Sequence, residues 1–139
     1  MIDIDNQTNY TPKIEFLTTV IDSLTNKDIE LIITSNETIQ QINLDHRGID
    51  KATDVLSFPY EDMPMTPLGS IVISMDFVRS KADELGHSLD DEFSLLFIHG
   101  LLHLLGYDHE CDNGEMRQKE EELIKKFNLP KSLIVRTEG

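Results

Sequence analysis

The sequence predicts a small α+β fold, with a mixed β-sheet and several helices in a single domain over residues 1–139. Helical and extended patterns follow one another without the regular alternation of a parallel α/β protein. No Gly/Ser-rich or Pro-rich linker, repeat or break in composition divides the chain. A chain of 139 residues buries roughly 68% of its unfolded surface, which is enough for one independent core.

The first predicted helix begins at Thr11-Pro12, a cap followed by proline at the first helical position. Its apolar residues recur at helical spacing: Phe16, Leu17, Val20, Ile21 and Leu24. The β-branched run Ile29–Thr34 then predicts a strand. Ser35 or Asn36 caps a short second helix that follows this strand.

The middle of the chain predicts two more strands and a third helix. A loop over Arg47–Ala52 leads to a strand at Val55–Phe58, and a connection with two prolines leads to a strand at Ile71–Ser74. Ser74 is a candidate cap for the third helix, and Gly86 is placed to end that helix in a left-handed conformation.

A buried helix is predicted next, beginning at Ser88. The following carboxylates favour a helix start: Asp90, Asp91 and Glu92. From Phe93 to Leu105 this helix is apolar almost all round, which is typical of a helix inside the core. Asn113 then caps a last amphipathic helix, which Pro130 ends.

Composition limits the possible classes of protein. The chain has 12 Lys and Arg against 26 Asp and Glu, and this formal net charge of −14 argues against a general nucleic-acid or anionic-membrane binder. Its 39% of hydrophobic residues argues against a disordered tail, and no apolar run approaches the roughly 18 residues of a membrane span. Met1–Tyr10 lacks a signal-peptide pattern and Cys111 is the single cysteine, so we expect a cytoplasmic protein.

Three histidines predict a metal site on the buried helix. His99 and His103 are four residues apart, so their side chains project from one helix face. Gly106 can adopt the positive φ that ends the helix and turns His109 back toward them. Three imidazoles leave the fourth position of a zinc ion open, as in catalytic sites. The spacing is that of the metzincin signature, which predicts a zincin-like fold with a central metal-binding helix.

Gly100 occupies the position at which zinc peptidases carry the glutamate that acts as general base. Peptide hydrolysis therefore loses its proton acceptor, whereas hydrolysis of another bond type stays possible. Glycine inside a helix costs about 1 kcal/mol relative to alanine, so we expect something to approach the helix closely here. Either a crossing element of the fold or a substrate fits this expectation.

Arg47 is a candidate phosphate-binding residue. It precedes a glycine in the predicted loop, and its guanidinium group suits bidentate phosphate contact. A solvated loop arginine is the simpler alternative. Asp54 and Ser57 are likewise explained by capping of the loop and by hydrogen bonding at the strand edge.

Four strings of the sequence together resemble the YbeY family of rRNA maturation factors. They are HGLLHLLGYDH at His99–His109, TDVLSFP at Thr53–Pro59, LGSIVIS at Leu68–Ser74 and Met116-x-x-x-Glu120. The likeness covers roughly residues 42–124, and the first helix and strand fit as well.

This resemblance implies a bacterial, single-strand-specific endoribonuclease with a zinc-like ion. Members process ribosomal RNA, especially the 3′ end of the small-subunit RNA, and act in ribosome quality control. By position, His99, His103 and His109 are the metal ligands and Arg47 is the functionally important arginine. The implied partners are the small ribosomal subunit, one of its ribosomal proteins and a ribosome-associated GTPase, with no membrane.

Three residues depart from the family pattern. His46 replaces the usual Tyr before the arginine, Ala52 replaces the usual Pro before Thr53, and Ser70 replaces the acidic residue usual in L-G-D-I. An acid at position 70 therefore cannot be the base in this chain.

The expected mechanism combines a metal ion with Arg47 and Lys51. The ion lowers the pKa of water or polarises a phosphate oxygen, while the cationic side chains neutralise charge in the transition state. The general base stays open between water ionised by the metal, Asp108 and Glu120. Asp108 fits a partner of a histidine or a helix-end cap equally well, and Glu120 either points at the site or reaches water.

Two other functions stay open. A metzincin-like metallopeptidase would share the histidine spacing, but Gly100 and the lack of a clear Met-turn argue against it. A non-catalytic ribosome-assembly factor would use the metal only to hold its fold. The acidic residues cluster at Asp83–Glu92 and Asp108–Glu122, so we expect weak binding to free single-stranded RNA and delivery of the substrate by a ribosomal partner.

Overall fold

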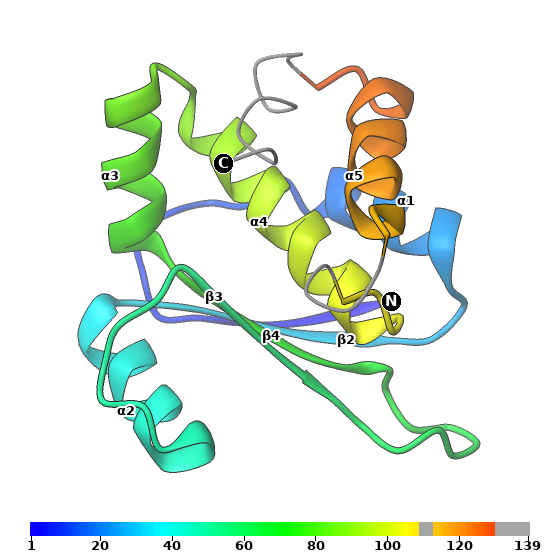
Figure 1. The fold of residues 1–139 in the computed structure, drawn as a ribbon, viewed down its shortest axis with the longest axis horizontal. Coiled ribbons are helices and arrows are strands. Elements are labelled where there is room, and N and C mark those ends of the chain that lie inside the picture. The colour runs from blue at the N-terminus through cyan, green and yellow to red at the C-terminus, as the bar shows by residue number, and fades with distance from the viewer. Residues whose placement is uncertain (109–112, 130–139) are drawn as a thin grey trace.

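The computed structural model describes residues 1–108 and 113–129, and these form one four-stranded sheet with five helices (Figure 1). The elements are β1 (Ile2–Asn6), α1 (Ile14–Leu24), β2 (Ile29–Thr34), α2 (Asn36–Arg47), β3 (Val55–Pro59), β4 (Gly69–Ser74), α3 (Met75–Leu85), α4 (Leu89–Leu104) and α5 (Glu115–Lys126). The predicted α+β class is confirmed. None of the helices in this part of the chain is long and apolar enough to cross a membrane.

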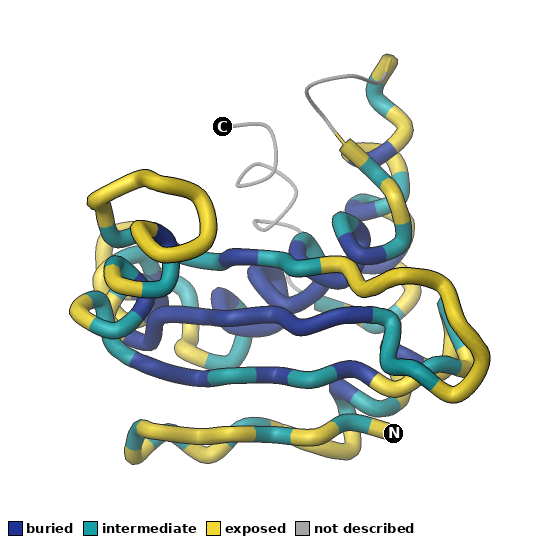
Figure 2. Tube along the Cα trace, turned by 90° about the horizontal axis from the view of Figure 1, so that it is seen from below, coloured by how far each residue is buried: buried dark blue, intermediate teal, exposed yellow. Residues whose placement is uncertain are grey.

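The sheet is mixed, as predicted. Its strand order is β1-β2-β4-β3; β1, β2 and β4 run parallel, and β3 pairs antiparallel to β4. All six residues of β4 are buried, whereas β1 is a largely exposed edge strand (Figure 2). The other edge of the sheet is β3, which contacts α4.

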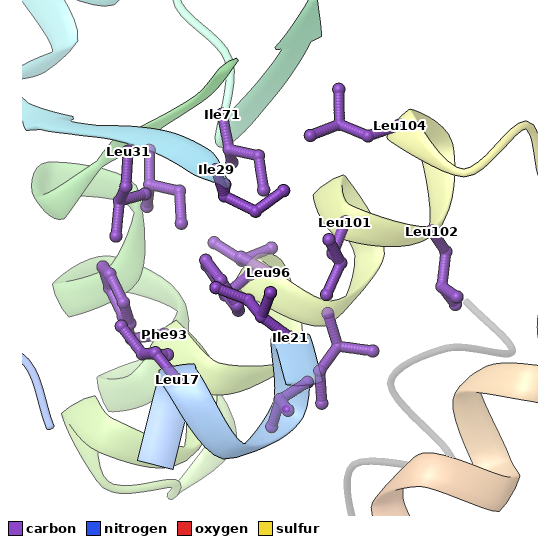
Figure 3. Packing of buried hydrophobic residues seen from close by; sticks show 14 of the residues in the cluster. Leu17, Ile21, Ile29, Leu31, Ile71, Phe93, Leu96, Leu101, Leu102 and Leu104 are labelled. Carbon is purple, nitrogen blue, oxygen red and sulfur yellow. The ribbon is translucent and has the colours of Figure 1, made fainter. Parts of the chain in front are cut away.

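The core lies between the sheet and the helices on one of its faces. Alternate strand residues such as Ile71 and Ile73 point toward this face, where α1, α3, α4 and α5 supply the other apolar side chains. Figure 3 shows Leu96 and Leu101 of α4 inside this cluster. The intervening residues Leu56 and Val72 face the opposite side, where they pack against Ile39 of α2. The predicted burial of α4 is therefore confirmed.

Helix α1 begins at Ile14 and not at the predicted Thr11-Pro12. The ring of Tyr10 lies 5.0 Å from that of Phe93 on α4, and its hydroxyl donates to Asp90 at 2.5 Å. These contacts hold the preceding segment in a non-helical conformation against α4. The cap signal was thus overridden by a tertiary contact.

Arg47 is the last residue of α2, which corrects the prediction of a loop over Arg47–Ala52. The helix ends because Gly48 has φ 70° and its N–H donates to the carbonyls of Asn43 and Leu44. This left-handed cap fixes the backbone that carries Arg47. A helix end positions a side chain more firmly than the expected loop would.

Strand β1 was not predicted, although Ile2 and Ile4 alternate with acidic residues at the two-residue period of a strand. Ser74 occupies the N-cap of α3, but its hydroxyl donates to Oδ1 of Asn36 and forms no cap bond. Helix α5 has Gly114 as its N-cap, one residue after the predicted Asn113. The predicted break at Pro130 lies outside the described residues.

Candidate metal centre

The last two turns of α4 place two histidines side by side. His99 and His103 have ring centroids 4.7 Å apart, and their Nε2 atoms are separated by 3.1 Å. Both side chains are partly exposed, although most residues around them on α4 are buried. The predicted common face of these two residues is confirmed.

The outer nitrogens of both rings face hydrogen-bond acceptors. Nδ1 of His99 lies 2.6 Å from Oε1 of Glu120 on α5, and Nδ1 of His103 lies 3.0 Å from the carbonyl oxygen of Tyr107. A carboxylate and a carbonyl can only accept, so each Nδ1 carries the hydrogen. In a neutral imidazole the Nε2 atom is then the acceptor, and the two acceptor lone pairs converge.

Converging imidazole lone pairs fit a cation. Two nitrogens bound at about 2.0–2.1 Å to a tetrahedral zinc ion lie about 3.3 Å apart, close to the separation in this structure. The predicted third ligand, His109, lies outside the described residues. Within residues 1–108 and 113–129, no group of three His, Cys, Asp or Glu side chains could hold a metal.

The turn after α4 has the predicted conformation. Gly106 has φ 100°, which favours glycine, and its N–H donates to the carbonyl of His103. The N–H of Tyr107 donates to the carbonyl of Leu102, so the chain folds back on the helix end. This turn supplies the carbonyl that binds Nδ1 of His103, a role that no side-chain pattern could reveal.

Gly100 is explained by packing, which decides between the two alternatives. A Cβ atom at this position would lie 2.9 Å from Cγ2 of Ile71 and 3.2 Å from both Oγ of Ser57 and Cγ2 of Val55. Oγ of Ser57 also donates to the carbonyl of Gly100 at 3.0 Å. The glycine therefore allows β3 and β4 to cross α4 closely, and it holds the histidines near the free edge of β3.

A cavity of about 520 Å³ opens beside the two histidines. It is lined by Arg47, Asp54, Val55, Leu56, Ser57, Pro59, His99, His103, Gly106, Tyr107 and Asp108. The C-terminus of α2 and the edge strand β3 thus bring Arg47 to the same cavity as the histidines. No carboxylate in the described part of the chain forms an ion pair with this exposed arginine.

The remaining candidate residues differ in their exposure and in whether they line the cavity. Glu120 is 4% exposed and points at the site, which decides between its two predicted orientations. Asp108 is exposed in the cavity wall. Asp54 lines the cavity and its Oδ1 accepts from the N–H of Val55 at 2.8 Å, as expected of a capping residue. Lys51 is exposed and is absent from the cavity lining.

The chain is similar to known proteins in sequence and in fold. The sequence model of the family described as Endoribonuclease YbeY matches residues 3–128. Curated proteins named Endoribonuclease YbeY are 63% identical over 139 residues in Sulfurimonas denitrificans, with both chains fully covered, and 64% identical over 138 residues in Nautilia profundicola, with 99% of each chain covered. A solution structure of a Thermotoga maritima protein has a TM-score of 0.61 at 28% identity and covers 96% of this chain and 95% of its own.

Proposed function

Since the chain belongs to the YbeY endoribonuclease family, we propose that it is a zinc-dependent enzyme that cleaves single-stranded RNA. We propose that it acts in the cytoplasm. Its proposed roles are the processing of the 3′ end of the small-subunit rRNA and ribosome quality control. The observation that carries the proposal is the shared cavity of Arg47, His99 and His103. A cation site and a guanidinium group in one cavity suit a phosphodiester substrate.

The proposed metal ligands are His99, His103 and His109. The first two fit a zinc ion because their Nε2 lone pairs converge, with Nε2 atoms 3.1 Å apart. When bound, zinc would supply a Lewis acid for a phosphate oxygen and for water. With a zinc ion bound to histidines of the buried helix α4, the site would resemble that of a zincin in its metal as well as in its histidine spacing.

The protein residues divide the remaining work. Glu120 and the carbonyl of Tyr107 accept the Nδ1 hydrogens of the two histidines, which fixes the imidazole tautomer and ring orientation. Arg47 donates to the phosphate and neutralises charge that develops in the transition state. Lys51, four residues later in the sequence, is the second cationic side chain of the proposal; it is exposed and does not line the cavity.

Asp108 is the proposed side chain for proton transfer. It is exposed in the cavity wall, so it can exchange protons with substrate and water. Glu120 is less suited, because it is buried and already accepts the hydrogen of His99. Water ionised by the metal remains the alternative that requires no side-chain base.

The proposed partners follow from the family and from charge. A chain with a net charge of −14 binds free RNA weakly, so a ribosomal partner must deliver the substrate. We assign this role to the small ribosomal subunit through one of its proteins, together with a ribosome-associated GTPase. A membrane is not among the proposed partners.

Two variants test the proposed function. Arg47→Ala should lose RNA cleavage and keep its zinc content, whereas His103→Ala should lose both. Zinc would be measured by atomic emission on the purified chain, and cleavage on single-stranded RNA with and without small ribosomal subunits. Lys81→Ala, at an exposed ion pair with Glu84 on α3, is the control. Cleavage unchanged in both test variants would indicate a contaminating nuclease and refute the proposal.

Two further experiments, one on the purified protein and one in cells, test the two alternative functions. Chelator-sensitive digestion of casein would favour a metallopeptidase, against which Gly100 argues because it occupies the position immediately after His99 where zinc peptidases carry a glutamate. Normal ribosome maturation in cells that carry only Arg47→Ala would favour a non-catalytic assembly factor.

A further inference from the structure

Two aromatic rings form a surface pair beside the cavity. The exposed His46, on the last turn of α2, has its ring centroid 5.2 Å from that of Phe58 on β3, with an angle of 52° between the ring planes. Phe58 is half-buried and packs against the apolar cluster below α2. The His46–Phe58 pair therefore has one ring exposed to solvent and one ring anchored in the fold.

The chain places this pair at the rim of the cavity. Neither His46 nor Phe58 is part of the cavity lining. Arg47, the next residue after His46, does line it, and so does Leu56, which shares its face of β3 with Phe58. The left-handed cap at Gly48 fixes the end of the helix that carries both His46 and Arg47. The side chains of consecutive helix residues diverge by about 100°, so the exposed ring of His46 is placed for the base of a neighbouring nucleotide and not for the nucleotide whose phosphate contacts Arg47.

Because the protein is strongly acidic, an exposed aromatic ring can contribute affinity for RNA that phosphate contacts cannot. Only 12 basic residues oppose 26 acidic ones, so phosphate contacts alone provide little affinity for RNA. Stacking of a base on an aromatic side chain raises affinity by about 5- to 150-fold and does not depend on net charge. Unpaired bases are also available for stacking in single strands, unlike those inside a duplex.

We propose that the His46 ring, supported by Phe58, is a stacking platform for an unpaired base of the RNA, next to the nucleotide whose phosphate Arg47 contacts. This inference rests on the proposed ribonuclease function and adds a base subsite to it. The platform selects for an unpaired base and has little preference among base types, because every base has an aromatic face.

Substitutions at position 46 separate stacking from simple packing. His46→Leu keeps an apolar contact with Phe58 but removes the aromatic face, whereas His46→Phe keeps both. His87→Leu makes the same chemical change between α3 and α4, at the opposite end of α4 from the two candidate ligands. Thermal unfolding of each zinc-loaded chain shows whether the fold is retained.

The probes are a fluorescein-labelled 2′-O-methyl oligoadenylate and the same oligomer with abasic residues, compared by fluorescence anisotropy. Wild type, His46→Phe and His87→Leu should bind the adenylate about tenfold more tightly than the abasic oligomer. His46→Leu should lose this difference at unchanged melting temperature.

Equal affinity of the wild type for the two oligomers would overturn the proposal, as would full retention of the difference in His46→Leu. Cleavage assays on unmodified RNA test the proposed ribonuclease function separately from the stacking platform. If the wild type cleaves RNA but does not discriminate the oligomers, only the stacking platform fails. If it neither cleaves RNA nor discriminates them, both inferences fail.

Discussion

Oε1 of Glu120 lies 2.6 Å from Nδ1 of His99, and this contact joins α5 to the side of α4 that carries the two histidines. Glu120 is 4% exposed, so its carboxylate has little access to water. A buried carboxylate needs such a donor, and the imidazole in turn needs an acceptor at Nδ1 to keep Nε2 directed at a cation. The pair thus serves the packing of α5 and the proposed metal site together.

Glu120→Gln should weaken zinc binding by about 10- to 100-fold, because a neutral amide orients the imidazole less strongly and lowers its basicity. Competition with a chromophoric chelator measures this affinity. Glu122→Gln, a change to an exposed residue on the same helix, is the matched control and should bind zinc like the wild type. Unchanged affinity in Glu120→Gln would refute the assigned role of the carboxylate.

Gly100→Ala should lower the free energy of unfolding by up to about 2 kcal/mol. The added Cβ lies 2.9 Å from Cγ2 of Ile71, a fully buried branched side chain that cannot move aside. This overpacking costs about 1–3 kcal/mol, which exceeds the gain of about 1 kcal/mol in helix propensity. Urea unfolding of the purified variant checks the sign, and a stabilised variant would contradict the packing explanation.

Ser88→Ala should destabilise the fold by about 1 kcal/mol and leave zinc binding unchanged. Oγ of Ser88 accepts from the N–H of Asp91 at 3.1 Å and so caps α4 at the end far from His99 and His103. Ser88→Asn preserves an acceptor and should restore most of the stability. Thermal unfolding and zinc titration of both variants test this separation of stability from the site.

Helix α4 could be predicted almost to the residue because its signals are local. The Ser88 cap, the acidic first turn and the apolar stretch all agree, and the structure has the helix at Leu89–Leu104. That His99 and His103 share one helix face was predicted correctly for the same reason, since helical spacing alone brings them together. Strand β1 was missed because its alternating signal is short, with two isoleucines in five residues; in the described part of the chain it pairs with β2 at one edge of the sheet.

The surroundings of the site depend on contacts between distant segments and could not be predicted in the same way. Glu120 is 21 residues from His99, and only the docking of α5 on α4 decides that it faces the site. The need for glycine at position 100 is explained only by the crossing of β3 over α4. The position of Arg47 depends on the Gly48 cap, which ends α2 directly after it. Sequence patterns identified these residues, whereas tertiary packing determined what each one contacts.

Binding to single-stranded RNA should be weak and should depend little on salt. Among the lysines and arginines of residues 1–108 and 113–129, only Arg47 lines the cavity, with Lys51 nearby in the sequence. Two phosphate contacts predict a slope of about −1.4 for the logarithm of the association constant against that of the salt concentration. A general nucleic-acid binder with many phosphate contacts would show a far steeper slope.

Titration of labelled single-stranded RNA between low and physiological salt measures this slope. Arg47→Ala should reduce its magnitude by about 0.7, the value for one released counterion on a single strand. The net charge of −14 then prevents indiscriminate binding of RNA. Affinity for RNA comes instead from contacts in the cavity, from base stacking and from a partner that delivers the substrate. Tight binding of free RNA at physiological salt would contradict this account.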